Sequence, residues 1–157
     1  MNDYEYGWML IAKKEQGQKE IPGAAHNPRI VEYHGTTTLR ANTDEVPWCS
    51  SFVNWVMNKS GHRTTRSAAA RSWLAYGIEV PIQYGAIAVT TRSGSTSKTA
   101  GHVGFVVRYT DTRIWLLGGN QSDTVKISSF PRSILLGCRM PVNYEKLRIP
   151  STKSLIA

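Results

Sequence analysis

The period of the hydrophobic pattern changes near Gly85, and this change constrains the fold more than any other feature of the sequence. Before it, apolar residues recur at helical spacing in segments that end near a glycine. After it, short apolar runs with alternating character are separated by polar turns. Helices followed by a run of strands indicate an α+β fold, in which N-terminal helices pack on an antiparallel sheet. The chain of 157 residues is long enough for one domain with its own core.

Four helices are expected before the change, at residues 4–16, 28–33, 47–59 and 67–75. The third is framed most clearly, because Pro47 falls in its first turn and Gly61 follows its last turn. Asp44 is a candidate cap for this helix.

Five strands are expected after the change, at residues 86–89, 102–108, 113–118, 124–128 and 135–140. The polar segment 91–100 is expected to be a loop. We expect a single domain over residues 1–143, followed by a loosely ordered basic tail at residues 144–157.

The net charge of +8, from 19 basic and 11 acidic residues, favours binding to polyanions. The basic residues are scattered and form no nucleic-acid-binding motif, so we expect contact with an anionic envelope surface rather than with nucleic acid. No apolar run approaches the roughly 20 residues of a membrane span. The N-terminus lacks a signal-peptide pattern, and we therefore expect synthesis in the cytoplasm, as a monomer.

Cys49 lies where the third helix is expected to begin. A thiol at a helix N-terminus faces unpaired backbone N–H groups and the positive end of the helix dipole, and both favour the nucleophilic thiolate. Cys138 lies in an apolar strand, where a buried and inert thiol is expected. Two cysteines do not indicate a disulfide framework.

His102 differs from the other histidines because it begins a predicted strand, whereas His26, His34 and His62 lie in or beside turn-like segments. The strand that follows provides a possible partner. If residues 110–112 form a three-residue hairpin loop, the paired residue numbers sum to 222, and Asn120 lies beside His102 on the same face of the sheet. A two-residue loop would place that amide on the opposite face.

Such a set of residues has a defined chemical use. An imidazole can take the thiol proton of Cys49 and later protonate a leaving amine, while the amide of Asn120 holds the ring in one orientation. Metal binding is the alternative, in which Cys49, His102 and Asp44 or Asp123 would hold zinc. No Cys-x-x-Cys or His-x-x-x-His spacing supports that alternative.

At these residues the sequence resembles the CHAP and NlpC/P60 group of papain-like peptidoglycan hydrolases, and most of all a compact phage-type and bacterial family within it. The similar blocks occur in the same order between Trp8 and Pro141. They are Glu20-Ile21-Pro22-Gly23, Pro47-Trp48-Cys49-Ser50-Ser51-Phe52-Val53-Asn54-Trp55, Ala70-Arg71-Ser72-Trp73, Gly101-His102-Val103-Gly104-Phe105 and Gly118-Gly119-Asn120-Gln121.

The resemblance implies a papain-like core with Cys49 as nucleophile, His102 as base and Asn120 as orienting residue, and no cofactor. It implies cleavage of a peptidoglycan amide bond, either between the lactyl group and the first L-Ala or within the stem peptide. A phage lysin or a secreted effector would act in this way, and other factors would deliver it to the cell wall. No separate wall-binding domain is expected, so any targeting would come from the basic surface or from high expression.

The same residues leave alternatives open. Trp48, Trp73, Tyr33 and Asp44 are candidates for substrate binding, although aromatic residues are more often part of a core. The loop at residues 91–100 either borders the cleft or is a passive surface loop. A thioester could also be intercepted by an amine, as in an acyltransferase or transpeptidase. Finally, the chain could be a basic wall-binding module in which Cys49 is structural.

Overall fold

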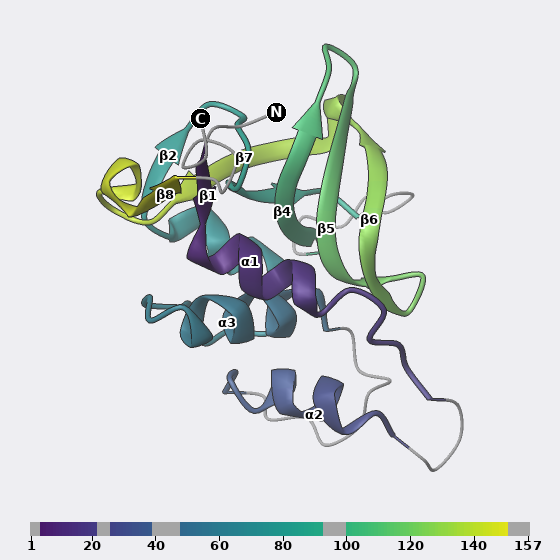
Figure 1. Ribbon diagram of the computed structural model, residues 1–157. Helices are drawn as coiled ribbons and strands as arrows, with labels where there is room; N and C mark the ends of the chain where they lie inside the picture. The colour runs from purple at the N-terminus through teal and green to yellow at the C-terminus, as the bar shows by residue number, and fades with distance from the viewer. Residues whose placement is uncertain (1–3, 22–25, 39–47, 93–99, 151–157) are drawn as a thin grey trace.

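The computed structural model describes residues 4–21, 26–38, 48–92 and 100–150, and it contains a six-stranded antiparallel sheet with helices beside it. The strand order in this sheet is β2-β7-β3-β4-β5-β6. The helices α1, α3 and α2 lie one beneath another next to the sheet (Figure 1). The predicted α+β class is therefore confirmed.

The helices begin close to their predicted positions, with two differences. The N-terminal helix starts at Gly7 because residues 4–6 are extended, and the predicted fourth helix is a six-residue 3₁₀ helix. The side chain of Ser67 accepts a hydrogen bond from the backbone N–H of Ala69, and this local bond competes with helix formation. The helices are α1 (Gly7–Lys14), α2 (Pro28–His34), α3 (Cys49–Lys59), η1 (Ala70–Ala75), η2 (Arg132–Ile134) and η3 (Tyr144–Leu147).

All five predicted strands are present, and three further strands are only three residues long each. The strands are β1 (Tyr4–Tyr6), β2 (Ile78–Val80), β3 (Ile87–Thr90), β4 (His102–Tyr109), β5 (Arg113–Gln121), β6 (Thr124–Pro131), β7 (Leu135–Met140) and β8 (Arg148–Pro150). A three-residue strand is too short to show a period of two, so β1, β2 and β8 could not be read from the hydrophobic pattern.

The expectation of a loose tail is corrected as far as Pro150. The strand β8 pairs with β1 in a separate two-stranded antiparallel sheet. Arg148 donates a hydrogen bond to the hydroxyl of Tyr6 (3.1 Å), and its guanidinium lies 4.4 Å from the ring centre of Tyr4. These contacts attach residues 148–150 to the start of the chain, while the end of the predicted tail, residues 151–157, lies outside the described residues.

Helix α3 lies at the centre of the fold, in contact with α1, α2, β4 and β5. Its first nine residues are buried, including the polar residues Ser50, Ser51 and Asn54. Buried polar groups are tolerated when they are hydrogen-bonded. The hydroxyl of Ser50 donates to the carbonyl of Ser67 (2.7 Å), and the amide of Asn54 donates to the same carbonyl (3.1 Å). These bonds fix the helix that begins at Cys49.

The β4–β5 hairpin differs from the prediction in two ways that compensate for each other. Tyr109 pairs with Ile114, so the turn contains two residues, Asp111 and Thr112, rather than three. A β-bulge between Val106 and Arg108 then inserts one extra residue into β4. The predicted pairing of Phe105 with Leu117 is therefore present, although the three-residue loop that predicted it is wrong.

A second bulge lies near the end of β5. Gly118 pairs with Lys126, but Gln121 pairs with Thr124, so β5 has one more residue than β6 over this stretch. Asn120 lies within the bulge and has a positive φ of 57°, a conformation that asparagine tolerates better than most residues. The extra residue advances the strand by one position, and Gln121 then takes the place that an unbroken ladder would give to Asn120.

Candidate active site

Cys49 is the first residue of α3, as the sequence predicted, and its side chain is 6% exposed. The backbone N–H groups of Ser50 and Val103 form hydrogen bonds with its sulfur. The residue thus combines the N-terminus of a buried helix with an N–H from the beginning of β4, and both favour a negative charge on sulfur.

His102 begins β4, and its ring is held by Gln121. The Nε2 atom of His102 lies 2.8 Å from Oε1 of Gln121. The amide nitrogen of Gln121 donates to the carbonyls of Leu116 (3.1 Å) and Lys126 (2.6 Å), which fixes the amide oxygen toward the imidazole. An oxygen can only accept, so Nε2 of the ring carries a proton and Nδ1 is left to face the thiol.

Cys49 and His102 form a side-chain hydrogen bond, and each changes the pKa of the other. Burial raises the pKa of the Cys49 thiol. The hydrogen bond and charge of His102, together with the two backbone N–H groups, lower this pKa by more than burial raises it, so that the net shift is downward. Burial lowers the pKa of His102, but Cys49 and Gln121 raise it by more. Both shifts favour a thiolate–imidazolium pair.

The residue that orients His102 in the structure is therefore Gln121, one position after the predicted Asn120. The β5 bulge is the reason, because it moves Gln121 to the position beside the imidazole. Asn120 lies at the wall of the adjoining pocket instead. Sequence reasoning missed Gln121 because a one-residue bulge leaves no mark in the hydrophobic pattern; the available signal was an amide pair directly before a turn.

The aromatic candidates for substrate binding belong to the core. The side chains of Trp48, Trp73 and Tyr33 are each 0% exposed. Their polar atoms also have partners: Tyr33 donates to Glu15 (2.7 Å), and the indole of Trp73 donates to Ser50 (3.0 Å). These rings pack in the core around α3, the helix that begins at Cys49. The fourth candidate, Asp44, lies outside the described residues, as does its expected capping role.

A pocket of about 360 Å³ opens in front of the cysteine and the histidine. The ring of Phe130 lies beside His102, with 5.4 Å between ring centres. The residues that line this pocket come from α3, the segment after β3, and strands β4 to β6. They are Cys49, Thr91, Arg92, His102, Asn120, Gln121, Ser122, Ser128 and Phe130. The pocket is large enough for a short peptide or sugar group next to the sulfur.

Glu20 has a supporting role that the sequence did not reveal. Its carboxylate accepts a hydrogen bond from the indole nitrogen of Trp48 (2.8 Å), the residue directly before Cys49. Its backbone N–H donates to the carbonyl of Asp123 in the β5–β6 turn (3.0 Å). Glu20 therefore connects the start of α3 to the turn that follows Gln121.

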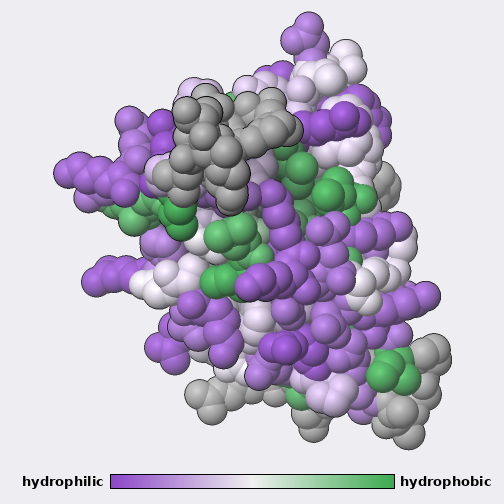
Figure 2. Space-filling model, in the orientation of Figure 1, coloured by the Kyte–Doolittle hydropathy of each residue, from purple (hydrophilic) through white to green (hydrophobic). Residues whose placement is uncertain are grey.

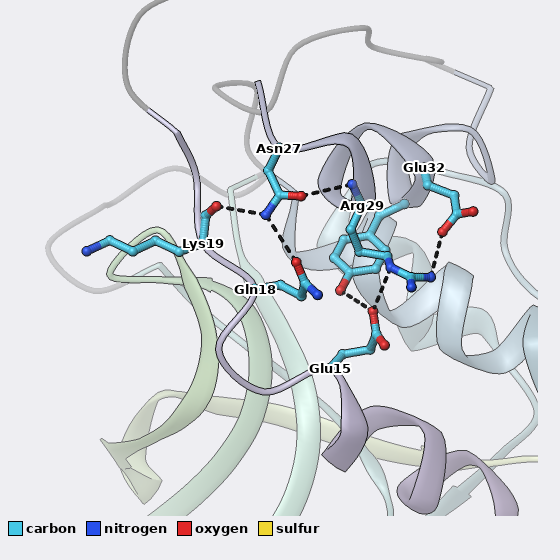
Figure 3. Close-up of polar contacts among 7 residues, drawn as sticks. Glu15, Gln18, Lys19, Asn27, Arg29 and Glu32 are labelled. Atoms are coloured by element: carbon cyan, nitrogen blue, oxygen red, sulfur yellow. Dashed lines mark hydrogen bonds and ion pairs between the residues drawn. The ribbon is translucent and has the colours of Figure 1, made fainter. Parts of the chain in front are cut away.

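A polar network holds the segment before Glu20 against α2 (Figure 3). Asn27 caps α2 by accepting from the N–H of Arg29 (2.9 Å), and its amide donates to Gln18 (3.1 Å) and to the carbonyl of Lys19 (2.9 Å). Arg29 forms ion pairs with Glu15 and Glu32. The site is thus supported by the N-terminal segment as well as by the sheet.

Two adjacent glycines allow different tests of this arrangement. A Cβ atom at Gly118 would lie 2.5 Å from Oε1 of Gln121, whereas one at Gly119 would lie 2.7 Å from the Trp48 ring. We expect Gly118→Ala to displace the amide from His102, together with its hydrogen bonds to Leu116 and Lys126. The alkylation of Cys49 by iodoacetamide in mildly acidic solution should then slow, because the thiol loses part of the effect of His102 that lowers its pKa.

The matched variant Gly119→Ala should behave in the opposite way. It overpacks the contact between β5 and α3, which costs about 1–3 kcal/mol and lowers the thermal unfolding midpoint by several degrees. Alkylation and thermal unfolding, followed by mass spectrometry and circular dichroism, separate the two effects. An unchanged alkylation rate in Gly118→Ala would show that Gln121 does not control the pair.

The remaining polar groups are consistent with a site built on one cysteine. Cys138 is 2% exposed, and burial raises its pKa to about 11, as expected for an inert thiol. Among the described residues, no group of three His, Cys, Asp or Glu side chains lies close enough together to hold a metal ion. Within the same residues, none of the helices has the length and apolar character required to cross a membrane.

Comparison with protein families matches the CHAP domain to residues 41–120, just over half of the chain. The match includes Cys49, His102 and Asn120 and ends one residue before Gln121. In the comparison with curated proteins, none matched.

Proposed function

Because the chain belongs to the CHAP family of papain-like domains that act on peptidoglycan, we propose that it is a cysteine-dependent hydrolase of a peptidoglycan amide bond, with Cys49 as nucleophile and His102 as base. The observation that supports this proposal most directly is the hydrogen-bonded series Cys49–His102–Gln121 at the wall of a pocket. In this proposal Gln121 replaces Asn120 as the positioning residue.

The reaction follows from the positions of these groups. The Cys49 thiolate attacks the scissile carbonyl carbon, and the carbonyl electrons move to oxygen. The backbone N–H of Cys49, at the first position of α3 where no intrahelical acceptor exists, would bind this oxyanion. The tetrahedral intermediate collapses, the C–N bond breaks, and Nδ1–H of His102 protonates the leaving amine. A thioester on Cys49 remains.

Water completes the cycle. Nδ1 of His102 takes a proton from water, the water oxygen attacks the thioester, and the C–S bond breaks to release the carboxyl product and regenerate the thiolate. The ring of Phe130 lies beside His102 and provides an apolar surface next to the imidazole. An amine in place of water would give the transpeptidase reaction that the same residues permit.

The surface charge supports binding to the cell wall. The chain has a net charge of +8, and hydrophilic residues predominate on the face shown in Figure 2, where they interrupt the apolar patches. A cationic surface raises the local concentration of enzyme at anionic wall polymers. We propose that the protein acts there after delivery by other factors, as a phage lysin would.

Digestion of purified sacculi tests the proposed function and identifies the bond. Mass spectrometry of the soluble products should show new free amines. A free N-terminal L-Ala on the peptide indicates an amidase, and an internal amino terminus in the stem peptide indicates an endopeptidase. Exchanged or crosslinked peptides would indicate a transpeptidase instead. Adsorption of the protein to sacculi with no covalent product would contradict the proposal and favour a binding module.

A further inference from the structure

Arg92 lies at the wall of the catalytic pocket, and the catalytic mechanism does not use it. It follows β3 by two residues and lines the pocket together with Cys49 and His102. It is exposed, and within the described part of the chain no hydrogen bond or ion pair occupies its guanidinium. No aspartate or glutamate is among the described residues that line this pocket. Among the described residues that line the pocket, Arg92 is therefore a cation without an acidic neighbour.

The position of this cation works against the catalytic pair when the pocket is empty. The positive charge of Arg92 opposes protonation of His102, and it lowers the pKa of the imidazole, although the larger effects of Cys49 and Gln121 outweigh it. A substrate that brings a negative charge to Arg92 would remove this opposition and stabilise the imidazolium at the same time. The arrangement thus favours an anionic substrate group beside the scissile bond.

The other groups around the guanidinium indicate the kind of anion. Thr91, Asn120 and Ser128 line the same pocket and provide neutral hydrogen-bonding groups, while Phe130 provides an apolar surface. A carboxylate fits a single arginine, which can bind both of its oxygens in parallel. Stem peptides of peptidoglycan contain carboxylates, which can also occur as primary carboxamides.

On the basis of the proposed function, we infer that Arg92 binds a free carboxylate of the stem peptide close to the scissile amide, and that the enzyme therefore prefers stem peptides in which this carboxylate is not amidated. The pocket that holds Arg92 is the catalytic pocket itself, so carboxylate recognition and positioning of the scissile carbonyl are coupled. Arg92 is a specificity residue and takes no part in proton transfer.

The test compares two substrates and four proteins. The first substrate is a muropeptide that the wild-type protein releases or cleaves in the sacculus digest; the second is the same muropeptide with its stem carboxylates converted to primary carboxamides. The proteins are the wild type, Arg92→Gln, Arg92→Lys and Arg63→Gln. Arg63 is a matched control because it is an exposed arginine in a separate pocket, beside Tyr76 and Val142.

We expect the wild type to have a kcat/KM about tenfold higher on the free carboxylate, since a charge-assisted hydrogen bond typically has an effect of this size. The ratio of kcat/KM on the free carboxylate substrate to kcat/KM on the carboxamide substrate should fall close to one in Arg92→Gln. This ratio should be partly kept in Arg92→Lys and unchanged in Arg63→Gln. Equal rates on both substrates, or a preference that survives Arg92→Gln, would overturn the inference while leaving the hydrolase intact. Absence of cleavage of sacculi would instead contradict the proposed function.

Discussion

Replacement of Cys49 or His102 by alanine should abolish the release of muropeptides from sacculi, with a loss of at least about 10⁴-fold. The first variant has no nucleophile, and the second has neither a base for the thiol nor an acid for the leaving amine. Soluble products measured by mass spectrometry over time give the rate. Each variant should keep the fold, because neither side chain is among the large buried groups that fill the core.

Cys138→Ala is the matched control for the loss of a thiol. This cysteine is buried in β7, pairs with Ala88 and Val80, and has a raised pKa, so it has no part in the proposed chemistry. Cys138→Ala should retain nearly full activity, and circular dichroism should show the same secondary structure for all variants. If Cys49→Ala cleared sacculi at the wild-type rate, the thiol would be structural and the proposed mechanism would be wrong.

The sequence placed Cys49 at the start of a helix and His102 at the start of a strand, as in the structure, because these positions depend on local features. The helix α3 begins at Cys49, and the apolar residues Phe52, Val53 and Val56 that follow recur at helical spacing. A strand begins at His102 because alternating apolar residues follow Gly101 directly. The family match and the structure agree with the predicted papain-like α+β core at these points.

The third member of the site depended on register, and register was not readable from the hydrophobic pattern. One bulge in β4 compensates for the shorter turn, and a second bulge in β5 replaces Asn120 by Gln121 beside the imidazole. A bulge changes the side-chain alternation by one residue without changing which residues are apolar. The prediction based on paired numbers therefore placed Asn120 beside the imidazole, where the structure places Gln121.

Long-range packing explains why the aromatic residues that were candidates for substrate binding are buried in the core. Trp48 and Tyr33 are adjacent to the site in sequence or in space, but both are buried around α3 because this helix is covered by α1 and α2 as well as by the sheet. The sequence did not show that α3 would be covered on several sides. The pocket beside Cys49 is lined instead by residues after β3 and in β4 to β6.

Gln121→Ala should lower kcat/KM by about 10- to 100-fold, less than the loss of the base itself, because the imidazole is still present but no longer held. The pH dependence of Cys49 alkylation by iodoacetamide gives a readout that lost packing would not change. In the wild type, the Gln121 hydrogen bond raises the pKa of His102. Its removal lowers that pKa, so the imidazolium that protonates the leaving amine is lost at lower pH.

The window of the thiolate–imidazolium pair should therefore narrow from both sides in Gln121→Ala. Its alkaline limit is measured by the pH dependence of kcat/KM, because a thiolate without the imidazolium is still alkylated, and this limit moves down with the pKa of His102. Its acid limit is measured by alkylation and moves up with the pKa of Cys49, which loses part of the effect that holds it below its usual range. Asn120→Gly is the comparator, since glycine accepts the positive φ at this position and the variant removes only a pocket side chain. It should reduce kcat/KM modestly and leave the pH profile in place.

The loss of the Gln121 side chain also leaves the carbonyls of Leu116 and Lys126 without their donor, which costs about 1–3 kcal/mol if water does not replace it. Gly118→Ala displaces the amide and loses the same hydrogen bonds, whereas Gly119→Ala overpacks the Trp48 ring and leaves the amide in place. A narrowed pH window in Gln121→Ala and Gly118→Ala, but not in Gly119→Ala, is the outcome that positioning by Gln121 requires. A narrowed window in Asn120→Gly instead would return the orienting role to Asn120.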